Sequence, residues 1–119
     1  MTAESALDAR TLHELLESVG GDHEFFAELI DEFLDDAPRQ FESLRAATTS
    51  GDAEVMRRAA HTLKSSGRTF GAAAFGSMCQ EAEAAAAGGD LEVVGRRIDA
   101  IGDALDRVLA ELRAARDGG

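Results

Sequence analysis

The feature that most constrains this fold is a set of three glycine–aspartate breaks, at Gly20-Gly21-Asp22, Ser50-Gly51-Asp52 and Gly88-Gly89-Asp90. Glycine after a helix readily adopts the left-handed conformation that ends it, and the following aspartate can cap the next helix. Gly71 marks a further tight turn. The chain is therefore predicted to form helices joined by short loops.

The segments between these breaks carry apolar residues at helical spacing. The last segment, from Leu91 to Leu112, is the cleanest amphipathic helix, and a short one begins near Asp8. Pro38 lies inside the long segment after Asp22 and removes one backbone hydrogen bond, which predicts a kink rather than an end. We expect an all-α fold, an antiparallel four-helix bundle with an additional short N-terminal helix as a lid.

Composition supports this fold and limits the function. Thr, Val and Ile total only 14 residues, with no Trp or Tyr, which disfavours a sheet. The net charge of −11 disfavours nucleic-acid or membrane binding and favours a monomer, and no segment is apolar enough to span a bilayer. The single Cys suits a cytoplasmic location. We expect one domain over residues 1–119, with flexible ends at 1–7 and 116–119.

The predicted helix over residues 52–70 has a basic face in an acidic protein. On a helical wheel, one side carries the only histidine of this helix together with cations and a small residue: Arg57, Arg58, His61, Lys64, Ser65 and Arg68. Four cations and no acid lie between Arg57 and Arg68, whereas residues 22–36 hold seven acids and no base. Most charge runs are only solvated faces. Because the sign here opposes that of the whole protein, we predict a local anion site.

His61 is the candidate reactive residue on this face. Its helix angle points it away from the apolar stripe, and a neutral exposed imidazole is a competent nucleophile and phosphoryl carrier. Lys64, one turn later, could neutralise phosphoryl oxygens, and the small Ser65 leaves room for a partner. His13 and His23 lack such surroundings and are interpreted as structural.

Other kinds of site fit poorly. No His, Asp or Glu follows His61 at three or four residues, and its neighbouring cations would repel a metal ion. The sequence has neither a Gly-x-Ser-x-Gly elbow nor a Gly-rich phosphate loop. Cys79 lies on an apolar stripe and is interpreted as a small core residue. Neither a metal nor a cofactor is expected in this chain.

Residues 60–72 resemble the histidine-containing phosphotransfer (HPt) domain family. The family pattern is a His, a Lys three residues later, small residues after it and a Gly ten residues after the His. His61, Lys64, Ser65, Ser66 and Gly71 match it in turn. The similarity extends over almost the whole chain, including the acidic helix with paired aromatic residues and the glycine–aspartate starts.

The resemblance implies a phosphoryl carrier rather than an enzyme. His61 would accept a phosphoryl group from the aspartate of a response-regulator receiver domain, or donate it to one, and the receiver would supply the magnesium ion. The partners implied are receiver domains and a hybrid sensor histidine kinase. Arg57, Arg58 and Arg68 would contribute to docking. Gly71 is assigned as a structural motif residue.

Two positions depart from the typical pattern. Ser65 stands where the family often has Gly, and its hydroxyl could bond the phosphoryl group or crowd the partner. Glu83, 22 residues after His61, stands where Gln or Glu often lies near the imidazole. Its carboxylate could orient the ring by accepting a hydrogen bond, yet it would repel a phosphoryl group.

Two alternatives remain open at this stage. The chain could be the phosphotransfer module of a chemotaxis-type kinase, phosphorylated from ATP by a separate kinase domain, as the Thr69-Phe70-Gly71 ending suggests. It could also be a non-catalytic helical adaptor that uses the basic face only for binding. The initiator Met and the lack of a kinase or receiver segment favour a free-standing shuttle in a phosphorelay.

Overall fold

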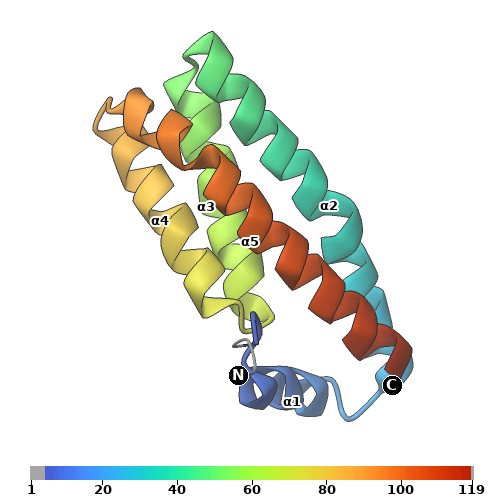
Figure 1. Ribbon diagram of the computed structural model, residues 1–119. Coiled ribbons are helices and arrows are strands. Elements are labelled where there is room, and N and C mark those ends of the chain that lie inside the picture. Colours follow the sequence, from blue (N-terminus) through green and yellow to red (C-terminus); the bar gives the residue numbers. More distant parts are fainter. Residues whose placement is uncertain (1–4, 119) are drawn as a thin grey trace.

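The computed structural model describes residues 5–118, which form five α-helices and no strand. The helices are α1 (Ala9–Ser18), α2 (His23–Ser50), α3 (Ala53–Thr69), α4 (Ala73–Ala87) and α5 (Leu91–Gly118). Helices α2 to α5 lie side by side, and each contacts two of the others, in the order α2, α3, α4, α5 and back to α2 (Figure 1). The short α1 lies across one end of this bundle (Figure 1). The predicted four-helix bundle with an additional N-terminal helix is confirmed.

The aspartates of two predicted breaks begin helices as expected. The side chain of Asp22 accepts a hydrogen bond from the Phe25 amide at 3.0 Å, and that of Asp52 accepts one from the Val55 amide at 3.2 Å. Each bond satisfies a backbone donor that the first turn leaves unpaired. Helix α2 continues through Pro38 and ends only at Ser50, so the proline does not terminate it, as predicted.

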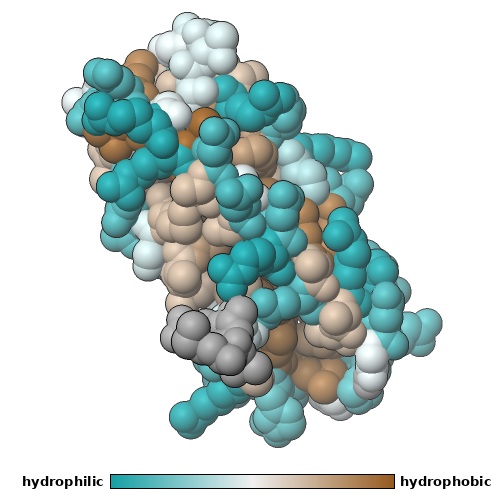
Figure 2. All heavy atoms as spheres, in the orientation of Figure 1, coloured by the Kyte–Doolittle hydropathy of each residue, from teal (hydrophilic) through white to brown (hydrophobic). Residues whose placement is uncertain are grey.

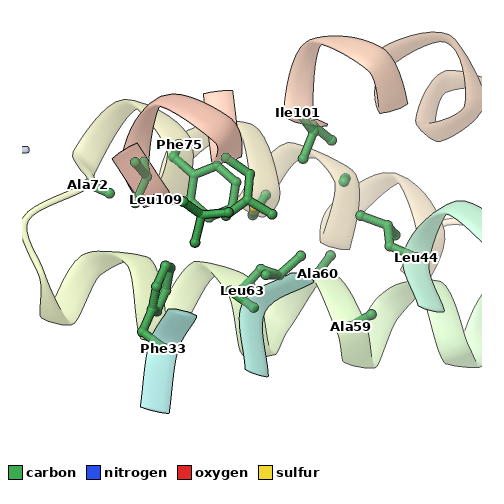
Figure 3. Packing of buried hydrophobic residues seen from close by; sticks show 14 of the residues in the cluster. Phe33, Leu44, Ala59, Ala60, Leu63, Ala72, Phe75, Ile101 and Leu109 are labelled. Carbon is green, nitrogen blue, oxygen red and sulfur yellow. The ribbon is translucent and has the colours of Figure 1, made fainter. Parts of the chain in front are cut away.

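The core lies between the four long helices and contains no buried polar or charged residue within residues 5–118. Phe75, Leu63 and Leu109 fill its centre (Figure 3). Gly67 of α3 faces Phe75 so closely that a Cβ there would lie 2.9 Å from the ring. Because Gly67 has no side chain, α3 and α4 can pack closely. This close packing places side chains of α3 beside side chains of α4.

The N-terminal end is more ordered than the sequence suggested. We predicted that residues 1–7 are flexible, but Leu7 is buried and the Glu111 carboxylate of α5 holds the segment before it. Glu111 accepts hydrogen bonds from the Ala6 amide at 2.6 Å, the Leu7 amide at 3.1 Å and the Ser5 hydroxyl at 2.5 Å. These contacts were not predicted, because a single buried leucine has no periodicity to reveal it; the flexibility of the end stays a prediction. Residues 1–4 lie outside the described part.

The C-terminal end also differs from the prediction of a flexible tail over 116–119. Helix α5 continues to Gly118, and Arg116 forms an ion pair with Asp31 of α2 at 2.7 Å. This contact joins the last turn of α5 to the neighbouring helix, while the flexibility of the tail stays a prediction. Residue 119 lies outside the described range.

Gly71 joins the turn after α3 to the N-terminal segment. Its φ of +83° is left-handed, and its carbonyl accepts a hydrogen bond from the Asp8 amide at 2.9 Å. A Cβ at this position would lie 3.0 Å from both the Asp8 carbonyl oxygen and the Thr11 Cβ. Both the backbone conformation and the lack of space therefore require glycine. The structure supports a structural role for Gly71 at the end of α3.

The surface is mostly hydrophilic, with a tan area over the alanine-rich α4 (Figure 2). Phe25, at the start of α2, is the most exposed large apolar residue within residues 5–118. None of the described helices is long and apolar enough to cross a membrane.

Candidate functional site

His61 lies near the middle of α3, on the side of this helix that faces α4. Its side chain is 56% exposed, whereas Ala60 before it and Leu63 after it are buried in the core. The rigid helix therefore presents the imidazole to solvent at a fixed place. This exposure agrees with the position predicted from the helical wheel.

Glu83 of α4 holds one nitrogen of this imidazole. Its Oε2 lies 2.8 Å from Nδ1 of His61, and only 19% of the Glu83 side chain is exposed. Because an ionised carboxylate can only accept a hydrogen bond, Nδ1 must carry the proton. In the neutral ring the other nitrogen, Nε2, then has a free lone pair and can act as a nucleophile. The structure thus brings Glu83 to the imidazole, where the sequence resemblance suggested it.

Lys64 meets the same carboxylate. Its Nζ lies 2.6 Å from Oε1 of Glu83, and its side chain is only 18% exposed. The helical wheel placed Lys64 on the basic face with His61, but a wheel for one helix does not show that α4 covers most of the Lys64 side chain. The hydrogen bond from Lys64 lowers the pKa of Glu83, burial opposes that shift, and the bond with His61 adds to it. One ionised carboxylate therefore joins the imidazole to the only lysine.

The rim arginines are paired rather than free. Arg57 contacts Glu54 at 2.7 Å, and Arg58 approaches the same carboxylate at 3.6 Å. The bond from Arg57 is the main reason that the pKa of Glu54 is lowered. Arg68 donates a hydrogen bond to Oε1 of Gln80 on α4 at 2.5 Å. All three side chains lie on α3 as predicted, but Glu54 offsets much of the charge of the first two.

Ser65 and Gly71 lie apart from the contacts made by Glu83. Ser65 is exposed one turn after His61, and its carbonyl accepts a hydrogen bond from the Thr69 hydroxyl at 3.1 Å. Its own side chain is small and leaves the surface beside the imidazole open. Gly71 is buried at the end of α3 against the N-terminal segment. The compact group is therefore His61, Lys64 and Glu83.

The remaining chemically active side chains are not assembled into a site. His13 pairs through Nε2 with Glu17 at 3.0 Å, on the exposed face of α1. His23 is exposed at the start of α2. Cys79 is buried, and burial raises the pKa of its thiol to about 12, so it is not a thiolate near neutral pH. Within residues 5–118 no group of three or more His, Cys, Asp or Glu side chains could hold a metal ion.

A groove between α2 and α3 was not predicted from the sequence. Its α3 wall includes Thr62, the residue after His61, and Ser66 one turn later, while its α2 wall carries Glu32 and Asp36. The acidic run was visible in the sequence, but its position beside α3 depends on how the helices pack. An apolar position at Leu29, followed by acids one turn on, was the only signal that could have suggested this groove.

Comparison with known proteins identifies the family. A family model described as the Hpt domain matches residues 28–115. Among solved structures, the chain is similar to histidine-containing phosphotransfer protein B (HptB) from Pseudomonas aeruginosa PAO1, with a TM-score of 0.89 and 27% identity over 98% of this chain and 99% of that one. The comparison with curated proteins gave no match. The match covers most of the chain, including α3 and the residues around His61, so this protein belongs to the Hpt domain family.

Proposed function

We propose that the protein carries a phosphoryl group on Nε2 of His61 between receiver-domain aspartates of a phosphorelay. The observation that supports this most directly is the contact between Nδ1 of His61 and Glu83 at 2.8 Å on a 56% exposed side chain. In the neutral imidazole this contact leaves the outer nitrogen, Nε2, without a proton and accessible to a partner. Membership of the Hpt family gives this nucleophile its phosphoryl-transfer context.

The transfer step needs only the imidazole and the incoming aspartyl phosphate. The lone pair of Nε2 attacks phosphorus, a P–N bond forms, and the P–O bond to the partner's aspartate breaks with its electrons leaving on the carboxylate. The ring becomes an imidazolium whose Nδ1–H still donates its hydrogen bond to Glu83, and this carboxylate stabilises the positive charge. Transfer to a second receiver is the reverse of this step.

Lys64 supports the same step by balancing charge. A phosphoryl group on His61 brings negative charge near Glu83, which alone would repel it. Lys64 already contacts Glu83 at 2.6 Å, so the carboxylate is largely neutralised before the phosphoryl group arrives. The flexible ammonium can then share its donors between Glu83 and a phosphoryl oxygen. This arrangement explains how a carboxylate is compatible with a phosphoryl carrier.

The receiver partner supplies what this chain lacks. We expect the receiver to bind the magnesium ion, which neutralises phosphoryl oxygens when bound, and to provide the aspartate that gives or takes the group. The proposed shuttle acts as a cytoplasmic monomer, and a hybrid sensor histidine kinase is its proposed upstream partner. Ser65 leaves room beside the imidazole for the receiver, while Arg57, Arg58 and Arg68 lie at the rim of the contact.

The test is direct labelling of the purified protein. A receiver domain carrying a radioactive phosphoryl group should label the unchanged protein and fail to label His61→Gln. The label should be acid-labile and alkali-stable, as a phosphoramidate is. Labelling only by an ATP-loaded kinase domain would instead identify a kinase module. Full biological activity of His61→Gln would identify an adaptor, and label on His13 or His23 would refute the site.

A further inference from the structure

A second groove, the α2–α5 groove, lies on the side of the bundle opposite His61. It has a volume of about 590 Å³ and is lined by residues 38–45 of α2 and 99–109 of α5, two helices that lie side by side (Figure 1). The long helices contact each other in the order α2, α3, α4, α5, so the α2–α5 side is opposite the α3–α4 side. His61 and Glu83 lie on that α3–α4 side. A molecule bound in the α2–α5 groove would therefore leave the imidazole uncovered.

The floor of this groove is apolar and includes a partly exposed aromatic ring. The ring of Phe41 lies so close to Gly102 that a Cβ on this glycine would be 2.9 Å from Cζ of the ring. Glycine inside a helix is less favourable than alanine, so α5 loses some helix stability where it admits the ring. Leu105 and Leu109 also line the groove and are buried. The floor is thus already formed, and a partner could bind without rearranging the core.

The rim of this groove is negatively charged. Asp99, Asp103 and Asp106 are spaced by four and three residues, so they lie along one exposed face of α5. The lining holds four carboxylates and one guanidinium, and this guanidinium, of Arg45, contacts the fourth carboxylate, of Glu42, at 2.6 Å. Within residues 5–118, Asp103 and Asp106 form no ion pair. The unbalanced charge of the groove is therefore negative.

Acidic residues alone would indicate only a solvated helix face. The α2–α5 groove differs because its acids surround an aromatic floor, and a cation above an aromatic ring is attracted to its face. Lys and Arg beside apolar side chains therefore match both parts of the groove. The chain's own basic face on α3 does not supply them, because Arg57 and Arg58 already share Glu54. The complementary surface is thus expected on a different protein.

The shape of the groove selects the kind of segment that fits. Its α5 wall advances about 15 Å from Asp99 to Leu109, which equals about three turns of a helix. Both walls are helices, so neither offers a strand edge to an extended peptide, whereas an amphipathic helix can lay its apolar face between them.

We propose that the α2–α5 groove is a docking surface for a basic amphipathic helix of a partner protein. The apolar ridge of that helix lies on Phe41, and its Lys or Arg side chains face Asp103 and Asp106. A partner bound in this way holds the protein while His61 on the opposite side stays open. Such tethering raises the local concentration of the protein near other components attached to the same partner. The proposal goes beyond the proposed function, because docking here needs neither His61 nor a phosphoryl group.

The test uses a synthetic helical peptide of Leu and Lys with its leucines along one face. Its Kd is measured by calorimetry at low and high salt. Asp103→Asn with Asp106→Asn changes the groove, and Glu32→Gln with Asp36→Asn removes the same charge from the other side of α2. Phe41→Leu removes the ring but keeps an apolar floor. Thermal melts check that each variant is folded, and NMR maps the amide signals that the peptide shifts.

The groove charge variant should raise Kd about tenfold at low salt and less at high salt, while the control pair changes it little. Phe41→Leu should raise Kd about threefold at both salt concentrations, because the ring contact is not screened. Shifted signals should lie on α2 and α5, and those around His61 should stay unchanged. Equal weakening by the two charge variants would show diffuse attraction and overturn the proposal. Shifts centred on α3, or no binding to the unchanged protein, would also overturn it.

Discussion

Two exposed histidines of this protein are each paired with a carboxylate, yet their surroundings differ. His61 uses Nδ1 to contact Glu83 on another helix at 2.8 Å, whereas His13 uses Nε2 to contact Glu17 one turn along its own helix at 3.0 Å. The Glu83 side chain is 19% exposed and the Glu17 side chain 66%. Both pairs consist of a histidine and a glutamate, so any difference in reactivity between the two imidazoles must come from where the glutamate lies.

Three consequences follow from that placement. A carboxylate fixed by a second helix keeps the ring in one orientation, while a pair on an exposed helix turn is worth only a few tenths of a kcal/mol. Holding Nδ1 leaves the outer nitrogen free, but holding Nε2 occupies it. Glu83 also has a cation beside it in Lys64. In this protein the histidine–carboxylate pair at the candidate site therefore comes from tertiary packing, whereas the pair on α1 is local to one helix.

The largest effect should follow replacement of His61 itself. His61→Gln removes the nucleophile and should abolish labelling by a phosphorylated receiver, because within residues 5–118 no other imidazole has a free outer nitrogen with a packed partner. His13→Gln serves as the matched control and should label as the unchanged protein does. The measurement is acid-labile radioactivity after gel separation. Substantial label remaining in His61→Gln would show that His61 is not the phosphorylated residue and would contradict the distinction drawn between the two histidines.

Removal of Glu83 should have the next largest effect. Glu83→Ala frees the imidazole to rotate, and misplacement of a reacting atom by about 1 Å can cost on the order of 100-fold in rate. We expect a decrease of roughly 10-fold to 100-fold in the transfer rate, with Glu83→Gln intermediate because an amide oxygen still accepts from Nδ1. Rapid-quench kinetics give the rates, and nitrogen NMR of the imidazole reports the tautomer.

The matched control for this prediction is Glu17→Gln, which should alter neither the transfer rate nor the tautomer of His61.

The pH dependence of folding stability tests the role of Glu83 in a second way. The lowered pKa of Glu83 means that its ionised form stabilises the fold fully above about pH 4.5 and that this contribution is lost as pH falls through the lowered value. The stability difference between the unchanged protein and Glu83→Gln should therefore shrink below pH 4.5. A difference that grows on acidification would contradict this.

Much of the fold could be predicted from the sequence because its signals are local. The capping residues Asp22 and Asp52, and the apolar period between the glycine breaks, depend only on neighbours in the chain. The exposure of His61 follows from its angle on one helix. The burial of Leu7 could not be predicted, because it depends on Glu111 over a hundred residues away.

The candidate site was predictable in its residues but not in its connections. The wheel identified Lys64, yet its burial depends on α4, and the link to Glu83 came from a family resemblance rather than from spacing. The pairing of Arg57 with Glu54 was also not predicted, because Glu54 lies before the acid-free stretch from Arg57 to Arg68. Contacts between side chains of different helices depend on how the helices pack, and the pattern of a single sequence gives little information about that packing.

Lys64 should have a smaller effect than Glu83, because Nδ1 keeps its partner when the lysine is removed. Lys64→Met retains an apolar stem for this mostly buried position and removes the charge. We expect the transfer rate to fall about tenfold, since one cation near the phosphoryl oxygens is lost at a site open to water before docking. The measurement is the rapid-quench rate beside a thermal melt of the same sample.

Comparison with Lys64→Ala separates charge from packing. Both variants should transfer at similar reduced rates, while the alanine variant should melt at a lower temperature because it also removes the stem that packs beside α4. Lys64→Arg should restore transfer only in part, because its planar fork differs from a compact ammonium. An unchanged rate in Lys64→Met would show that Lys64 serves the fold and not the reaction.

The smallest effect should come from the rim arginines, and here the chain offers a closely matched pair. Arg58 contacts Glu54 four residues before it at 3.6 Å, and Arg96 of α5 contacts Glu92 four residues before it at 3.8 Å. Both arginine side chains are 67% exposed. Arg58→Glu and Arg96→Glu therefore remove the same kind of pair and change net charge equally, but only the first lies near His61.

We expect Arg58→Glu to slow transfer roughly two-fold to five-fold at low salt and much less at high salt, because an exposed rim charge acts mainly on the association rate and is screened. The effect is small because Glu54 already offsets part of the Arg58 charge. Arg96→Glu should leave the rate unchanged at both salt concentrations. Slowing that does not depend on salt would point to a structural role for Arg58, and equal slowing in both variants would point to net charge. A loss confined to Arg58→Glu at low salt assigns the contact to the side of α3 that carries His61, where the packed carboxylate also lies.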